Sequence, residues 1–226
     1  MISFKQVAAA AALLAAAAAS HAGTVLGTSL LSGSKSIDTG ITASLSGSSS
    51  LCAKTVHGVS AVGVTGGASG CEVDIGESMT LSFSSAVRVS GVNLAFLYDG
   101  PEYKDVNEKA QLTATLAGGG SFIATLVATG TNVALASNGT VANIEKANAV
   151  DAGQWLWSNP FGNAAVTSIT FRSLAGAPAS SCHVCNNQSD YSLYSVTAAV
   201  PEPQTLPLLA AGLGIVSLVA SRRRVR

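Results

Sequence analysis

The sequence predicts an all-β fold, an antiparallel β-sandwich of the jelly-roll kind, for the central residues 23–199. Apolar and polar side chains alternate along several short runs there, and glycine-rich turns separate the runs. No apolar repeat with the period of a helix occurs between them. Short alternating runs broken by turn residues are typical of antiparallel sandwiches, in which each strand buries one face.

The strands are expected in a regular order along the chain. Residues 24–70 are rich in serine and glycine and alternate only weakly, which predicts early strands with long connections. Clearer alternation follows, with the apolar members Met79, Leu81 and Phe83; Val92, Leu94, Phe96 and Tyr98; Leu112, Ala114 and Leu116; Phe122, Ala124 and Leu126; and Ile169 and Phe171. Glycines at 118–120 are an expected break, and Asn138-Gly139 supplies the positive φ angles of a tight hairpin. The last strand is expected at 190–199, where Leu193 leaves the phase of Tyr194 and Val196; this indicates a bulge or a strand covered on both faces.

Residues 1–22 have the features of a secretory signal peptide. Lys5 gives a positive start, residues 7–19 are unbroken apolar, and Ser20-His21-Ala22 places small residues before the expected cut. The apolar run is shorter than the roughly 20 residues that a permanent membrane anchor needs. We therefore expect cleavage after Ala22, and the alternative is a buried alanine-rich helix.

Residues 200–226 contain a second apolar segment with a basic end. Val200-Pro201-Glu202-Pro203 precedes a charge-free stretch, for which we predict a transmembrane helix at 205–221. Its fifteen central residues would reach only about 22 Å, against a hydrocarbon core of about 30 Å. The chain then closes with Arg222, Arg223, Arg224 and Arg226. Basic flanks stay in the cytoplasm, so both ends predict that the body between them is exported, with a temporary inner-membrane intermediate.

The C-terminal pattern resembles the PEP-CTERM sorting signal, in which a Pro-Glu-Pro motif, an apolar helix and arginines follow in that order. The resemblance covers about the last 26 residues, with Pro201, Glu202 and Pro203 as the recognition motif. It implies cutting by an exosortase, a membrane cysteine protease of Gram-negative bacteria that make exopolysaccharide or biofilm. The segments at 100–108, 159–162 and 189–193 also resemble PEP-CTERM proteins, which implies a compact β-domain without a transferable activity.

The charge and the cysteines narrow the class of protein further. Of the 12 basic and 12 acidic residues, five basic and one acidic lie in the end segments, which leaves the body near −4. This excess of acid argues against nucleic acid as a partner. The four cysteines, Cys52, Cys71, Cys182 and Cys185, predict two disulfides in an oxidising compartment, with three connectivities open. Cys52–Cys71 with Cys182–Cys185 is the most local choice.

The acidic loop after residue 98 is a candidate calcium site. Its carboxylates recur at every third position, and they are Asp99, Glu102, Asp105 and Glu108. Ca²⁺ takes six to eight oxygen ligands, so gathered carboxylates favour it. The alternative is a solvated loop in which Lys104 and Lys109 pair with these acids.

Two further motifs have both a functional and a structural interpretation. Trp155 and Trp157 alternate, so they either form a platform that contacts a glycan or fill the sandwich core. Cys182-His183-Val184-Cys185 is best explained by a disulfide, because thioredoxin-like and haem contexts are missing. A zinc site there would need a fourth ligand such as His57.

No catalytic residues are assigned, because the sequence has no nucleophile elbow, zinc-protease motif or phosphate-binding loop. Acidic pairs of the kind that cleave glycosides are too common in sequences to count. We therefore expect a non-enzymatic surface or matrix protein that associates with exopolysaccharide and has no cofactor other than the candidate calcium. The alternative is a secreted carbohydrate-binding module.

Overall fold

The computed structural model describes residues 22–38, 40–103, 105–145, 153–178, 189–199 and 212–214. Residues Ala22–Val200 form one compact unit, one residue longer at each end than the predicted body. Residues 212–214 are helical. The predicted signal peptide up to residue 21 and nearly all of the predicted tail helix lie outside the described residues. Within the described ranges, no helix has the length and apolar character needed to cross a membrane.

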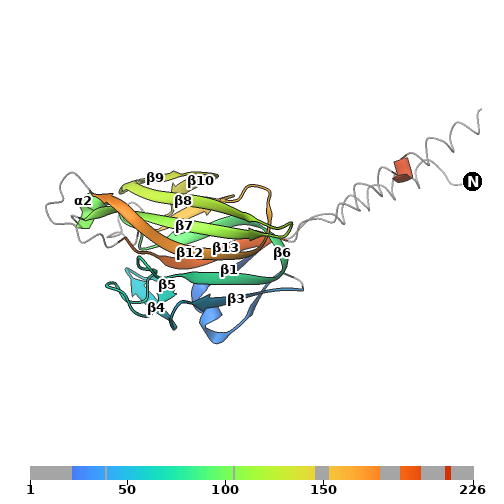
Figure 1. Ribbon diagram of the computed structural model, residues 1–226, viewed down its shortest axis with the longest axis horizontal. Coiled ribbons are helices and arrows are strands. Elements are labelled where there is room, and N and C mark those ends of the chain that lie inside the picture. Colours follow the sequence, from blue (N-terminus) through green and yellow to red (C-terminus); the bar gives the residue numbers. More distant parts are fainter. Residues whose placement is uncertain are drawn as a thin grey trace, which may run out of the picture. The chain divides into compact units, whose positions relative to one another are not determined.

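The body is built almost entirely from strands (Figure 1). The strands are β1 (Ala22–Leu26), β2 (Lys35–Asp38), β3 (Ile41–Gly47), β4 (Leu51–Val56), β5 (Val59–Val64), β6 (Met79–Ala95), β7 (Val106–Leu116), β8 (Ser121–Gly130), β9 (Val133–Ala136), β10 (Thr140–Asn143), β11 (Trp155–Ser158), β12 (Ala165–Pro178) and β13 (Ser192–Ala199). A 3₁₀ helix, η1 (Gly27–Ser32), follows β1, and a single helical turn, α2 (Gly100–Tyr103), precedes β7. The all-β prediction is confirmed.

Hydrogen bonds join the thirteen strands into one antiparallel sheet, whereas the sequence predicted the two sheets of a sandwich. The long strand β6 makes this connection. Its first residues pair with β3 and β12, and its last residues pair with β11 and β13. The change of partners accompanies an irregularity between β6 and β12, where the register shifts between Val166 and Ser168. The sequence predicted two strands here because Ser84, Ser85 and Ala86 interrupt the apolar alternation near this irregularity.

Two of the predicted turns were tested by the structure. The glycines at 118–120 connect β7 to β8, and Gly119 and Gly120 have φ angles of 92° and 80°. Asn138-Gly139 connects β9 to β10, but these strands pair with β8 and β11 respectively, so the predicted hairpin is wrong. The predicted bulge in the last strand is confirmed, because the register of β13 against β6 shifts between Leu193 and Ser195.

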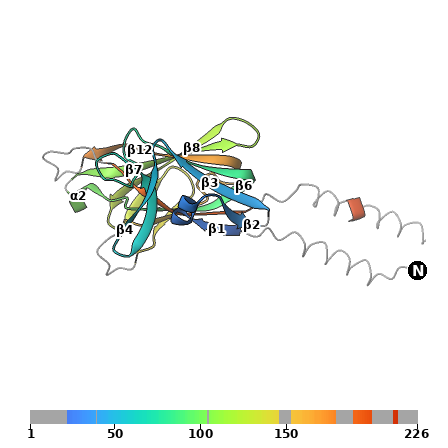
Figure 2. The ribbon, with the colours of Figure 1, turned by 90° about the horizontal axis from the view of Figure 1, so that it is seen from below.

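The core lies between the inward faces of the strands. Along β7, every second residue from Val106 to Ala114 is buried, and the same alternation buries Ala124, Leu126 and Ala128 on β8. Glu108 has the same phase as Ala110 and Leu112, so the strand turns an acidic side chain inward. The first and last strands of the body lie side by side, β1 against β13, and β2 lies beside β1 (Figure 2).

Candidate functional site

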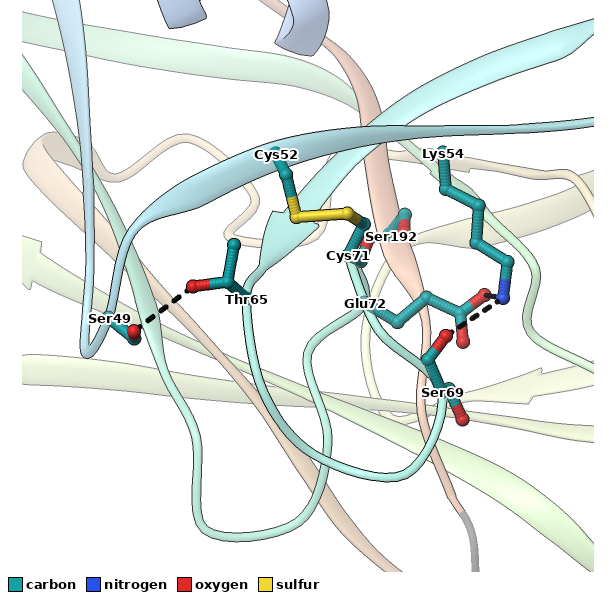
Figure 3. Close-up of a disulfide and its surroundings, with 8 residues drawn as sticks. All are labelled: Ser49, Cys52, Lys54, Thr65, Ser69, Cys71, Glu72 and Ser192. Carbon is teal, nitrogen blue, oxygen red and sulfur yellow. Dashed lines mark hydrogen bonds and ion pairs between the residues drawn. A yellow bond between two sulfur atoms is a disulfide. The ribbon is translucent and has the colours of Figure 1, made fainter.

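A disulfide fixes the connection between β5 and β6 against β4. Cys52 on β4 bonds to Cys71, with a Cα–Cα distance of 5.1 Å, which confirms this part of the predicted cysteine pairing (Figure 3). The Ser192 hydroxyl donates to the Cys71 carbonyl at 3.0 Å, and the Val64 N–H donates to the Glu72 carbonyl at 3.0 Å. Gly63 permits this close approach, because a Cβ there would lie 2.3 Å from the Cys71 carbonyl oxygen.

Glu72, next to the disulfide, forms an ion pair at the inner side of this connection. The Lys54 ammonium lies 3.0 Å from Glu72 Oε1 and also donates to the Ser69 carbonyl at 3.2 Å (Figure 3). The Ser69 hydroxyl donates to Asp190 Oδ2 at 2.5 Å. Residues from β4, from the 65–78 connection and from the segment just before β13 are thereby held together.

These residues form one wall of a pocket of about 290 Å³. The acidic loop between β6 and β7 also lines this pocket. The lining residues are Lys54, Val56, Ser69, Glu72, Tyr98, Asp99, Asp105, Val106, Glu108 and Asp190. Among its described lining residues the pocket thus combines five carboxyl groups with one cationic side chain, so carboxyl oxygens dominate its polar chemistry.

Two of the five carboxyl groups have strongly raised pKa values. Burial, the hydrogen bond to the Glu72 side chain and the charge of Glu72 together raise the pKa of Asp190 to about 8, although the Ser69 hydrogen bond lowers it. Burial also raises the pKa of Glu108 well above its usual value, assisted by the charge of Asp190, although the Tyr98 N–H donates to Glu108 Oε2. The carboxyl groups of Asp190 and Glu108 therefore resist losing their protons near neutral pH.

Asp99 differs from its neighbours in its hydrogen bonding. The residue is only 7% exposed, and its Oδ1 atom has no hydrogen-bond partner among the described residues. A buried carboxylate oxygen without a partner costs free energy, which the packing of the rest of the body must offset.

The predicted calcium residues are partly brought together. Asp99, Asp105 and Glu108 line the same pocket, and the side chain of Glu102 lies outside the described part. Across the described ranges, however, no three His, Cys, Asp or Glu side chains converge as a metal ion requires. The acidic loop is also not a solvated loop, because Asp99 and Glu108 are buried.

The tryptophan platform is wrong. Trp155 is 2% exposed and Trp157 is fully buried, and their indole N–H groups donate to the carbonyls of Leu97 (2.8 Å) and Asn138 (2.7 Å). Their alternation on β11 places both rings in the core, because the strand turns this face inward. No ring face is left for a glycan.

The remaining predicted residues fall partly outside the described chain. The residues Cys182, His183 and Cys185 lie outside the described residues, so the second disulfide stays a prediction. His57 is exposed at the turn between β4 and β5. The motif Pro201, Glu202 and Pro203 and the arginines Arg222, Arg223, Arg224 and Arg226 also lie outside the described residues.

Sequence reasoning missed Lys54, Ser69, Glu72 and Asp190. Lys54, Ser69 and Glu72 are separated from Asp190 by more than a hundred residues, and only the pairing of β13 with β5 and β6 brings the two parts together. A signal did exist for Glu108, whose phase on β7 matches that of the predicted core residues Leu112 and Ala114.

The body described above is a β-domain that precedes a short C-terminal segment in the sequence. Residues 199–224 match the family model of the PEP-CTERM protein-sorting motif, so the chain carries this sorting signal. The motif implies an exported protein that an exosortase processes and that is sorted to the cell surface, typically in Gram-negative bacteria. No curated protein and no solved structure matches the chain.

Proposed function

We propose that this chain is a non-catalytic component of the bacterial surface or extracellular matrix that associates with exopolysaccharide. It reaches this place through an inner-membrane intermediate, in which the tail helix holds the folded body until the exosortase cuts near Pro201-Glu202-Pro203. The observation that carries the proposal is the position of the sorting motif, whose match begins at the last residue of β13.

This position supports the order of events. β13 ends at Ala199 and the motif prolines follow at once. Proline has no backbone N–H and cannot continue a hydrogen-bonded ladder, so from the sequence we expect the motif to end the sheet and to favour an extended segment. An extended segment at the edge of a finished domain is the form of substrate that a protease can reach.

Replacing Pro201, Glu202 and Pro203 together with alanine tests the processing. We expect the triple variant to stay in the membrane fraction as a longer precursor. Mass spectrometry of the extracellular fraction should detect the shortened protein in cells that express the wild type and not in cells that express the variant. Gln204→Ala, next to the motif, is the matched control and should be processed normally. Normal release of the triple variant would refute the role of the motif.

The alternative function is a secreted carbohydrate-binding module. The acidic pocket favours it, because carboxylate oxygens in a small concave site can accept hydrogen bonds from sugar hydroxyls. Digestion of the matrix polysaccharide by a glycanase tests the association with polysaccharide that both functions share. Release of the protein into solution supports association with the polysaccharide, and unchanged retention on the cells contradicts both forms of the proposal.

A further inference from the structure

The hairpin of β4 and β5 lies at one end of the series of paired strands. Within the described strands, β5 pairs with β13 through one residue pair, Val62 with Leu193. The disulfide from Cys52 joins the hairpin to the 65–78 connection and not to β13. A link between β4 and the segment just before β13 would therefore fasten this hairpin to the central strands.

Lys54 and Asp190 carry the two chemical groups that such a link needs. The Lys54 ammonium on β4 lies 3.0 Å from Glu72 Oε1 (Figure 3), and the Asp190 carboxyl group hydrogen-bonds to the side chain of the same Glu72. Ser69 holds both partners a second time, because its carbonyl accepts from Lys54 at 3.2 Å and its hydroxyl donates to Asp190 Oδ2 at 2.5 Å. An amine, a carboxyl group and a shared proton acceptor are thus brought together, and the flexible stem of lysine lets the amine turn towards Asp190.

The protonation of the two acids suits the formation of an amide. Glu72 is 3% exposed and Asp190 is 6% exposed. Two buried carboxyl groups that hydrogen-bond to each other need a proton on one of them. Burial and the contacts with Glu72 raise the pKa of Asp190 to about 8, so Asp190 carries this proton at neutral pH. A neutral carboxylic acid is the form that an amine attacks, and the Glu72 carboxylate can take a proton from the Lys54 ammonium.

We propose that Lys54 Nζ and Asp190 Cγ become joined by an isopeptide bond after the body has folded, with Glu72 as the proton acceptor. Glu72 first takes one proton from the Lys54 ammonium. Nζ then attacks Asp190 Cγ, the carbon–nitrogen bond forms, and Oδ1 leaves as water with its own proton and a second proton from Nζ. The third proton stays on the amide nitrogen, so the step needs no oxidant and no other reactant.

The surroundings of the three side chains support this step. The Ser69 hydroxyl donates to Asp190 Oδ2, the oxygen on which negative charge builds up during the attack. The adjoining pocket of about 290 Å³ has room for the water molecule that leaves. The bond would join β4 covalently to the chain just before β13, whatever the protein binds at the cell surface.

The test compares masses of the processed protein purified from the extracellular fraction of the bacterium. The wild type should be lighter than its unlinked chain by one water molecule. Lys54→Arg keeps the charge and cannot form the bond, so its mass should exceed that of the wild type by the lysine-to-arginine difference plus one water. Glu72→Gln keeps both reacting groups and should leave most molecules unlinked. Lys35→Arg on β2 is the matched control and should change the mass only by the lysine-to-arginine difference.

Peptide mapping locates the bond. Trypsin does not cut after a modified lysine, so the reduced wild type should yield residues 36–88 joined to a peptide that begins at Ser173. Thermal melting shows that the variants are folded. A wild type that has retained the water and yields separate peptides would show an ordinary ion pair and overturn the proposal. A bond from Lys54 to another carboxyl group, or complete linkage in Glu72→Gln, would also overturn the assignment.

Discussion

The disulfide between Cys52 and Cys71 is expected to supply a measurable share of the stability of the body. The bonded residues are 19 positions apart. In the chain-entropy model, a cross-link that closes a loop of this length constrains the unfolded chain by about 3 kcal/mol. The double replacement Cys52→Ser with Cys71→Ser should therefore lower the free energy of unfolding by about 3 kcal/mol.

The size of the body converts this free energy into a temperature. A change of 1 kcal/mol shifts the melting temperature of a domain of 150 to 250 residues by about 2–4 °C, so we expect a decrease of about 6–12 °C. Urea denaturation of the processed protein measures the free energy, and calorimetry measures the temperature. The single replacement Cys71→Ser should cost about as much as the double one, because either change removes the cross-link.

Thr65→Val is the matched control on the same connection. It removes the exposed hydrogen bond between the hydroxyls of Ser49 and Thr65, 3.1 Å long, and should cost less than about 1 kcal/mol. A double cysteine variant that lost no more than this control would refute the reasoning. It would show that the ion pair of Lys54 with Glu72 and the hydrogen bond of Ser192 to Cys71 hold the connection by themselves.

Two further predictions concern the same region. Because the pKa of Asp190 is raised, the folded body without the proposed bond keeps a proton between about pH 4 and pH 8 that the unfolded chain has released, so stability should fall as the pH rises through this window. Urea denaturation of the Lys54→Arg variant, which cannot form the bond, should show this decrease from about pH 4 to pH 9, and adding Asp190→Asn should make it smaller. A rise in stability over the same range would contradict the prediction. Gly63→Ala should destabilise the body by about 1–3 kcal/mol, because the added Cβ would lie 2.3 Å from the Cys71 carbonyl oxygen. Gly118→Ala is the control, because a Cβ there has open space around it, and it should cost less than about 0.5 kcal/mol in the same thermal denaturation experiment. Equal costs for the two variants would contradict the packing argument.

The sequence predicted the class of fold because alternation is a local property. Met79, Leu81 and Leu112 are buried at the positions that the two-residue period assigned to the core. The same period left the two faces of a strand equivalent, so it could not decide between a core and a glycan platform for Trp155 and Trp157. Their burial depends on which neighbours cover β11, and this information is distributed over the whole sheet.

The pocket was predictable only in part for a related reason. Asp99, Asp105 and Glu108 are close in sequence, so their gathering on one loop was visible. Glu72 and Asp190 join them through strand pairings that span more than a hundred residues, and no local pattern encodes such pairings. Within the described chain the carboxylates of the loop do not come close enough together to hold a metal ion. Their spacing along the sequence could not reveal this, because it does not give the direction of the side chains.

The pairing of β1 with β13 links the fold to the proposed export. Ala22 lies opposite Ala199, so the expected signal-peptide cut and the start of the sorting motif lie at the same end of the body. β13 is also the partner of β5 and β6, so the sheet stays incomplete until the chain has crossed the membrane up to Ala199. The tail helix follows only a few residues later in the proposed pathway. It would therefore stop the chain just when the last strand becomes available, so that the exosortase cuts next to a body that is already folded.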